Sequence, residues 1–250
     1  MLSRPTSRAV GAAAPLVGGA GLVWAVGTAG PGLAVAVGCA TVIAVAVSSG
    51  LARQGRGLGP ADRVTATRAA LACGVAGLSA NAFTRPGGAG VLVALTVVAL
   101  VLDAVDGQVA RRTGTVTLLG ARFDMEVDAF LILVLSIDVG RGHGWWVLAI
   151  GLARYAVLVA GAGFAWLRQS VVPSRWRKAV AATQGVVLCL AASEALPRLW
   201  ADMALLGSAA LLAVSFGTEA AELWRRRSTV PVPPATLAVP EGCGAAVVAP

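Results

Sequence analysis

The side chains best suited to chemistry in this sequence are four aspartates set between two strongly apolar runs, residues 90–102 and 129–137. They are Asp103, Asp106, Asp124 and Asp128. An aspartate in a membrane-embedded helix costs roughly 2.5–3.5 kcal/mol, so carboxylates clustered beside apolar helices need a compensating partner. Carboxylate oxygens favour Mg²⁺, Mn²⁺ or Ca²⁺ over Zn²⁺, and we therefore expect a divalent cation site.

The first two aspartates fit one face of a helix. Asp103, Asp106, Gly107 and Ala110 stand at positions i, i+3, i+4 and i+7, which places them on one stripe. The small side chains of Gly107 and Ala110 leave room beside a metal. Arg111 follows directly and can approach a phosphate.

The other two aspartates belong to a second helix. Asp124 and Asp128 are four residues apart and so share a face. The polar link before them contains glycine, and Gly120 leaves further space beside the metals. A turn in this link would bring two carboxylates from each helix to a common cleft, where a cation is needed to offset their mutual repulsion.

The complete pattern resembles the signature of the CDP-alcohol phosphotransferases, also called CDP-alcohol phosphatidyltransferases, which reads D-x2-D-G-x2-A-R-x8-G-x3-D-x3-D. Every fixed position is matched in this chain. The matching residues are Asp103, Asp106, Gly107, Ala110, Arg111, Gly120, Asp124 and Asp128. The resemblance implies an enzyme with a two-metal site for Mg²⁺ or Mn²⁺ that displaces CMP from a CDP-linked lipid or alcohol. It also suggests a homodimer.

The same resemblance implies roles for individual residues. It implies that Asp103, Asp106 and Asp124 bind metal and that Asp128 is the catalytic base and also a ligand. It further implies a CDP-binding set. That set is Gly107, Ala110, Arg111 and Gly120.

A second, weaker element precedes the motif. The segment D-R-V-T-A-T-R resembles an N-x-x-T-x-x-R element that opens the first core helix in many relatives, with Asp62 in place of Asn and with Thr65 and Arg68 matching. One interpretation adds Thr65 and Arg68 to the CDP-binding set. The other makes the segment an ordinary helix cap with an interfacial arginine.

The composition predicts an all-α, polytopic membrane helix bundle. Hydrophobic residues make up 57% of the chain and charged residues 13%, against about 25% charged in soluble domains. The mean hydropathy is +0.80. The net charge of +8 could indicate nucleic acid in a soluble protein. Here the basic residues lie in short loops between apolar runs, so we expect membrane lipids and no nucleic acid as partners.

The apolar runs predict six core transmembrane helices after two N-terminal ones. The N-terminal helices are expected at 9–28 and 31–50, and the core helices at 64–83, 89–107, 122–140, 144–167, 179–196 and 201–223. The predicted organisation is an N-terminal helix pair (1–50), a basic interfacial connector (51–63), a phosphotransferase core (64–227) and a Pro-rich tail (228–250) that we expect to be disordered.

The distribution of basic residues predicts the topology. If the N-terminus is cytoplasmic and all eight helices cross, all but four of the 20 basic residues lie on the cytoplasmic side or its membrane interface. The exceptions are Arg85, Arg141, Arg154 and Arg198. The positive-inside rule therefore predicts a multi-pass cell-membrane protein with the aspartates on the cytoplasmic face.

Four basic residues are candidates for the acceptor site. Arg154 falls within an apolar span, where it either contacts the acceptor or a site carboxylate, or forms a structural ion pair. Arg175, Arg177 and Lys178 lie at the cytoplasmic mouth. They either bind the phosphate of an acceptor or lipid headgroup, or only set the topology.

The expected activity is transfer of a phosphatidyl or related phospho-alcohol group from a CDP-alcohol, with CDP-diacylglycerol as the first candidate, to an acceptor hydroxyl in phospholipid biosynthesis. A cation or proton transporter is an alternative that uses intramembrane carboxylates. It does not explain the set of Gly107, Ala110 and Arg111 or the fixed distance to Gly120. An inactive scaffold is a third alternative, and retention of all four aspartates argues against it.

Overall fold

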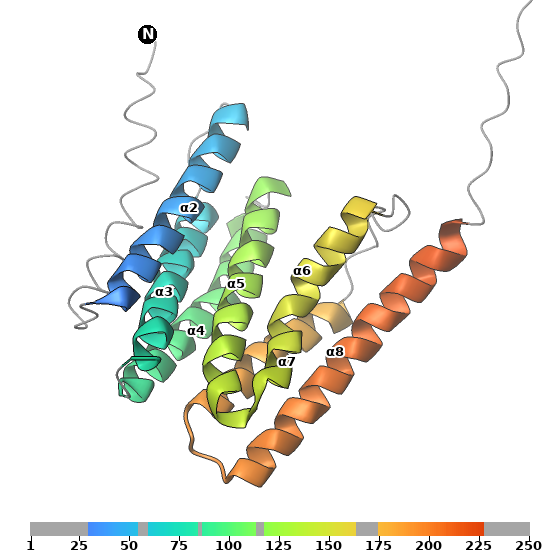
Figure 1. Ribbon diagram of the computed structural model, residues 1–250. Helices are drawn as coiled ribbons and strands as arrows, with labels where there is room; N and C mark the ends of the chain where they lie inside the picture. Colours follow the sequence, from blue (N-terminus) through green and yellow to red (C-terminus); the bar gives the residue numbers. More distant parts are fainter. Residues whose placement is uncertain (1–29, 55–59, 85–86, 114–117, 164–174, 228–250) are drawn as a thin grey trace, which may run out of the picture.

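The computed structural model describes residues 30–54, 60–84, 87–113, 118–163 and 175–227 (Figure 1). Within these ranges the chain is entirely helical, as predicted, with seven α-helices, one short 3-10 helix and no strand. The α-helices are α2 (Pro31–Gln54), α3 (Pro60–Ala82), α4 (Ala89–Thr113), α5 (Leu118–His143), α6 (Leu148–Gly163), α7 (Arg175–Ala192) and α8 (Arg198–Arg227). The predicted span at 9–28 and the tail at 228–250 lie outside the described residues.

Helices α3 and α5 occupy the centre of the bundle. Helix α3 packs against α2, α4 and α5, and α5 packs against α3, α6 and α7. Helices α2 and α8 lie at opposite edges (Figure 1). A single core joins most of these helices, because fully buried side chains reach it from α3, α5, α7 and α8. They are Val75, Leu135, Leu188 and Leu205.

Glycines let α2 approach α3 closely. A Cβ added to Gly77 would lie 2.8 Å from the carbonyl oxygen of Gly32 and 3.0 Å from the Cβ of Ala36. Asn81 of α3 reaches the start of α2, where its Oδ1 accepts a hydrogen bond of 2.7 Å from the Gly32 backbone N–H. Small residues at a crossing bring helix backbones together, and the hydrogen bond satisfies a donor that the first turn of a helix leaves open. Helix α2 is therefore firmly joined to the bundle.

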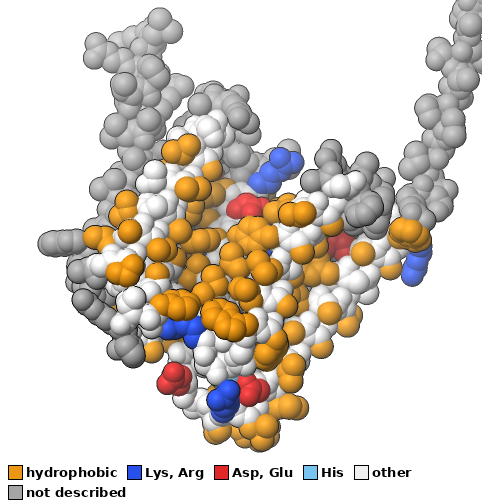
Figure 2. Space-filling model, in the orientation of Figure 1, with side chains coloured by type: hydrophobic (Ala, Val, Ile, Leu, Met, Phe, Trp, Pro, Cys, Tyr) orange, Lys and Arg blue, Asp and Glu red, His pale blue; other side chains and the backbone are white. Residues whose placement is uncertain are grey.

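Large apolar side chains remain on the surface of the bundle. Val42, Val159, Leu199 and Trp200 are 66–73% exposed. On the face shown in Figure 2, hydrophobic side chains cover the middle, and most of the charged side chains lie above and below them. Exposed apolar surface on this scale is expected where lipid, and not water, surrounds the helices.

Length and hydropathy alone identify two of the described segments as candidate membrane spans, Pro31–Gly50 and Arg198–Arg225. Shorter apolar segments cover Ala89–Val105, Trp145–Gly161 and Ala179–Ala192. The eight-helix count is therefore not established. Helices α3 and α5 are absent from both sets for a physical reason. They are the central helices, and they carry the charged residues of the candidate site described below, which lowers their mean hydropathy.

Several helices extend beyond the apolar runs from which they were predicted. Helix α4 continues to Thr113, past the expected end at 107, and α5 begins at Leu118, before the expected start at 122. Helices extend into both ends of the connector predicted at 51–63, because α2 ends at Gln54 and α3 begins at Pro60. Hydropathy marks the apolar part of a helix, whereas backbone hydrogen bonding continues into polar sequence.

Candidate active site

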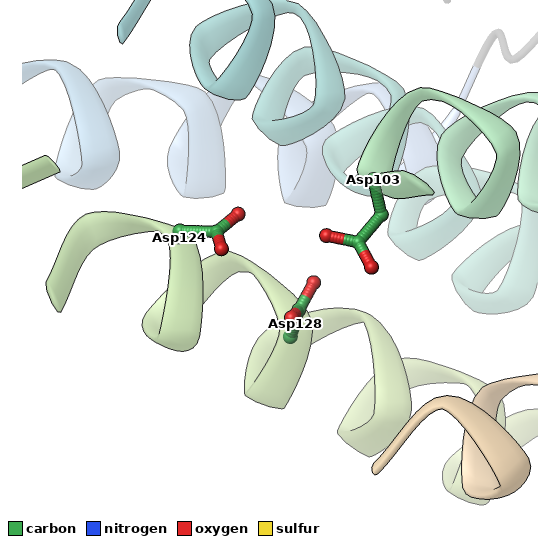
Figure 3. A group of neighbouring side chains, drawn as sticks. All are labelled: Asp103, Asp124 and Asp128. Carbon is green, nitrogen blue, oxygen red and sulfur yellow. The ribbon is translucent and has the colours of Figure 1, made fainter. Parts of the chain in front are cut away.

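Three of the four motif aspartates converge between α4 and α5. Asp103 comes from α4, and Asp124 and Asp128 come from adjacent turns of α5 (Figure 3). One carboxylate oxygen from each residue lies within 4.8 Å of the other two. The side chains of Asp103 and Asp124 are each 37% exposed and that of Asp128 is 33% exposed, so the cluster is open to a ligand.

The helix pattern accounts for this convergence. Asp124 and Asp128 are one turn apart, so both carboxylates leave α5 on one face. Helix α3 packs against α4 as well as α5 and so lies beside both helices that supply the aspartates. The predicted meeting of two acidic stripes is thus observed for three of the four residues.

Arg68 of α3 lies at the centre of the cluster. Its side chain is 1% exposed, and its Nη1 lies 2.9 Å from Asp103 Oδ1. The same Nη1 donates to Asp124 Oδ1, and Nη2 donates to Asp128 Oδ1. Arg68 is therefore not an interfacial side chain. It is a buried cation that ties α3 to both carboxylate-bearing helices.

The residues present fit a divalent metal by charge and by donor type. The single positive charge of Arg68 faces three carboxylates, which leaves a formal charge of about two negative units to be balanced by other groups or ions. Only oxygen donors are offered by the three aspartates, and Mg²⁺ and Mn²⁺ prefer such donors. Asp106 lies one turn after Asp103 on α4, but its side chain is outside the described residues.

The remaining predicted CDP-binding residues divide into two groups. Thr65 is 3% exposed and lies one turn before Arg68 on α3. Gly120 lies in the first turn of α5 and borders a cavity of about 710 Å³. The others are in the last turns of α4, where their side chains lie outside the described residues. They are Gly107, Ala110 and Arg111.

Among the four candidate acceptor residues, the structure describes the side chain of Arg154 alone, and its ion-pair partner is not one of the triad aspartates. Arg154 of α6 forms an ion pair with Glu126 of α5, with Nη2 2.9 Å from Oε1. This is the structural pairing that was the alternative to an acceptor contact. Arg175, Arg177 and Lys178 open α7, and their side chains lie outside the described residues.

Comparison with known protein families shows which family this chain belongs to. The family profile of CDP-alcohol phosphatidyltransferase matches residues 58–218, well over half of the chain. The chain belongs to the CDP-alcohol phosphatidyltransferase family. The match begins just before α3 and so includes Arg68 and all three triad aspartates, whereas α2 precedes it. A comparison with curated proteins and a comparison with solved structures each found no match.

Membership in the CDP-alcohol phosphatidyltransferase family carries several coarse properties. Its members are membrane-associated transferases that use a CDP-alcohol donor and an alcohol acceptor, and they typically depend on a divalent metal. The carboxylate triad is the part of this chain that could hold such a metal ion.

Proposed function

We propose that this protein transfers a phosphatidyl group from CDP-diacylglycerol to the hydroxyl of a polar alcohol, releasing CMP, in phospholipid biosynthesis. The observation that carries the proposal is the convergence of Asp103, Asp124 and Asp128 within 4.8 Å of one another. These are motif residues of the family to which the chain belongs. Acceptor candidates are glycerol 3-phosphate, inositol phosphate and phosphatidylglycerol.

The metal site would use all four motif aspartates. Asp103, Asp106, Asp124 and Asp128 would hold two Mg²⁺ or Mn²⁺ ions. When bound, these ions would supply positive charge to offset the negative charge of the pyrophosphate. Arg68 holds three of the carboxylates in place from α3, and its charge adds to the positive potential in the cleft.

Asp128 acts as the general base. A neutral alcohol is a poor nucleophile, so the Asp128 carboxylate takes the hydroxyl proton as the oxygen attacks the phosphorus that bears the diacylglycerol group. A bond forms between the acceptor oxygen and phosphorus, and the phosphorus–oxygen bond to CMP breaks. The electron pair of that bond leaves with CMP, and the proton remains on Asp128.

The donor and the acceptor would be bound by different sets of residues. The donor's CDP group would be bordered by a set drawn from α3, α4 and α5. This set is Thr65, Arg68, Gly107, Ala110, Arg111 and Gly120. Basic side chains would attract an acceptor that carries a phosphate. They are Arg175, Arg177 and Lys178, whereas Arg154 is already paired with Glu126.

The same proposal includes an arrangement in the membrane. Six core helices within 64–227 and two N-terminal helices would cross the cell membrane, and the protein would form a homodimer. The triad would lie at the cytoplasmic face, as the positive-inside rule predicts. A lipid donor could then keep its acyl chains in the bilayer while its cytidine remains in water.

Release of CMP from CDP-diacylglycerol tests the proposal. Purified protein in lipid vesicles is given Mg²⁺ or Mn²⁺ and a panel of alcohols, and CMP and the lipid product are measured together. We expect stoichiometric CMP and product with one acceptor of the panel and none after chelation of the metal. Metal-dependent ion flux across the vesicle without CMP release would favour the transporter alternative instead.

A further inference from the structure

A cavity of about 710 Å³ lies between α2 and α5, with contributions from α3 and α6. This volume is typical of small-molecule sites, which span about 300–1,000 Å³. Its walls are largely apolar. They include Val35, Gly38 and Val42 from α2 and Phe123, Val127 and Phe130 from α5. An apolar cavity at the edge of a membrane bundle is suited to a hydrocarbon chain.

The length of the cavity matches one leaflet of a bilayer. Its lining on α2 runs from Val35 to Val47, and twelve residues of helix rise about 18 Å. Half of the hydrocarbon core of a bilayer is about 15 Å. Val42 is 69% exposed, so the cavity is open along α2 and a chain can enter it sideways from the membrane.

One end of the cavity is polar. Asp62 of α3 borders it, as do Gly120, Arg122 and Glu126 from the first turns of α5. On α2, the lining residues nearest its C-terminal end are Ala46 and Val47. The cavity is therefore amphipathic along its length, with charged side chains at one end and apolar walls where a tail would lie.

The polar end adjoins the carboxylate triad. Phe123 and Val127 line the cavity, and Asp124 and Asp128 directly follow them on α5. The triad and the cavity thus occupy neighbouring faces of the same two turns. A lipid with its pyrophosphate at the triad could place a tail in the cavity without leaving the surface of α5.

We propose that α2 and α5 together bind one acyl chain of the CDP-linked lipid donor in this cavity. This inference rests on the proposed function and adds a subsite to it. Helix α2 precedes the family match at residues 58–218, so the wall that it supplies is an addition of this chain to the family core. The contact of Gly32 with α3 fixes that wall in place.

Photochemical labelling tests the proposal without requiring turnover. Full-length protein in phosphatidylcholine vesicles with Mn²⁺ is irradiated with CDP-diacylglycerol that carries a diazirine in one acyl chain, and labelled peptides are identified by mass spectrometry. A parallel sample receives the same diazirine chain on phosphatidylcholine. We expect the donor to label the cavity segments of α2 and α5 at least fivefold more than phosphatidylcholine does, and unlabelled donor to suppress that labelling.

Matched glycine substitutions test the same site by activity. A Cβ at Gly38 or at Gly207 meets no atom within 4 Å, but only Gly38 lines the cavity. Gly38→Phe should lower donor labelling at least fivefold and raise KM for a long-chain donor about tenfold. KM for a dihexanoyl donor should change less than twofold. Gly207→Phe should leave all three values unchanged, and Val42→Trp serves as the second cavity variant if Gly38→Phe does not fold.

Two results would overturn the acyl-chain site. They are equal labelling by donor and phosphatidylcholine, and no donor labelling of α2 or α5. Failure of the proposed function is distinguishable, because no donor of either chain length would then release CMP with any acceptor. Specific donor labelling in that case would still establish the cavity as a lipid site.

Discussion

Arg68 Nη1 lies 2.9 Å from Asp103 Oδ1, and through this contact the buried guanidinium of α3 holds the carboxylate of α4 beside those of α5. Arg68 therefore links three helices at the point where they converge. In the absence of metal it is the cation that offsets the mutual repulsion of Asp103, Asp124 and Asp128.

Replacing this cation should destabilise the protein in a metal-dependent way. Loss of one partner from a buried ion pair costs about 3–5 kcal/mol, and partial exposure of the carboxylates should reduce the loss for Arg68→Met to about 2 kcal/mol. Thermal unfolding in detergent with a chelator should show a lowered Tm. Added Mn²⁺ should raise the Tm of the variant more than that of the wild type, because the metal then replaces the missing charge.

Arg198 provides the control for this experiment. It lies 3.9 Å from Asp202 of the same helix, and its side chain is 73% exposed. Arg198→Met should change stability by less than about 1 kcal/mol. Equal Mn²⁺ responses in Arg68→Met and wild type would show that Arg68 and the metal do not share the carboxylates.

Asp128→Asn should remove turnover and leave the fold intact. Its carbonyl oxygen can still accept from Arg68, but the amide cannot take a proton, and loss of a general base lowers rates by about 10²–10⁴. The measurement is kcat for CMP release, alongside size-exclusion chromatography. Asp138→Asn, further along α5, should retain activity within about threefold. A normal kcat for Asp128→Asn would assign the base elsewhere.

Asp103→Asn should weaken metal binding. It removes one of three convergent carboxylates, and we expect the Mn²⁺ concentration for half-maximal activity to rise at least about tenfold. Direct Mn²⁺ titration by electron paramagnetic resonance gives the same comparison without turnover. Asp202→Asn is the matched control, since Asp202 contacts His143 at 2.6 Å in a separate pair. An unchanged Mn²⁺ affinity in Asp103→Asn would exclude this carboxylate as a ligand.

The carboxylate triad was predictable from sequence, because it follows from helix periodicity. Spacings of three and four residues fix which side chains share a face, and the short polar link between the two helices permits their return. The place of Arg68 was less accessible. The resemblance of its segment to the N-x-x-T-x-x-R element suggested that Arg68 binds the nucleotide or lies at the membrane interface. Its contact with carboxylates on α4 and α5 depends instead on how α3 packs against both helices.

The cavity could not have been predicted from the sequence of α2. That helix is almost entirely apolar from Pro31 to Val47, so its periodicity does not indicate which face meets α5. The face that α2 turns toward α5 is set by the close approach of Gly32 to Gly77, and these two residues are distant in sequence. Apolar runs likewise located the helices but not their ends, as α4 and α5 illustrate.

Thiol accessibility should reveal the predicted topology. Cys243 belongs to the tail beyond the described residues, and the positive-inside rule predicts that it is cytoplasmic. Ala195→Cys, in the connection between α7 and α8, should face the opposite side. In a background without the other cysteines, an impermeant maleimide should label position 195 in intact cells and Cys243 only after permeabilisation. The reverse pattern would place the triad on the outer face.

The contact between α2 and α3 gives a final prediction. Gly32 is the second residue of α2, and a Cβ there would collide with the Gly77 carbonyl and with Asn81. Gly32→Val should therefore displace α2 and destabilise the protein by about 1–3 kcal/mol or more. Gly90 is the second residue of α4 and has open space around it, so Gly90→Val is a matched control that should alter Tm little.

If α2 also forms a wall of the donor site, Gly32→Val should raise KM for long-chain CDP-diacylglycerol while Gly90→Val does not. Loss of stability with an unchanged KM would mean that α2 supports the fold without contacting the donor.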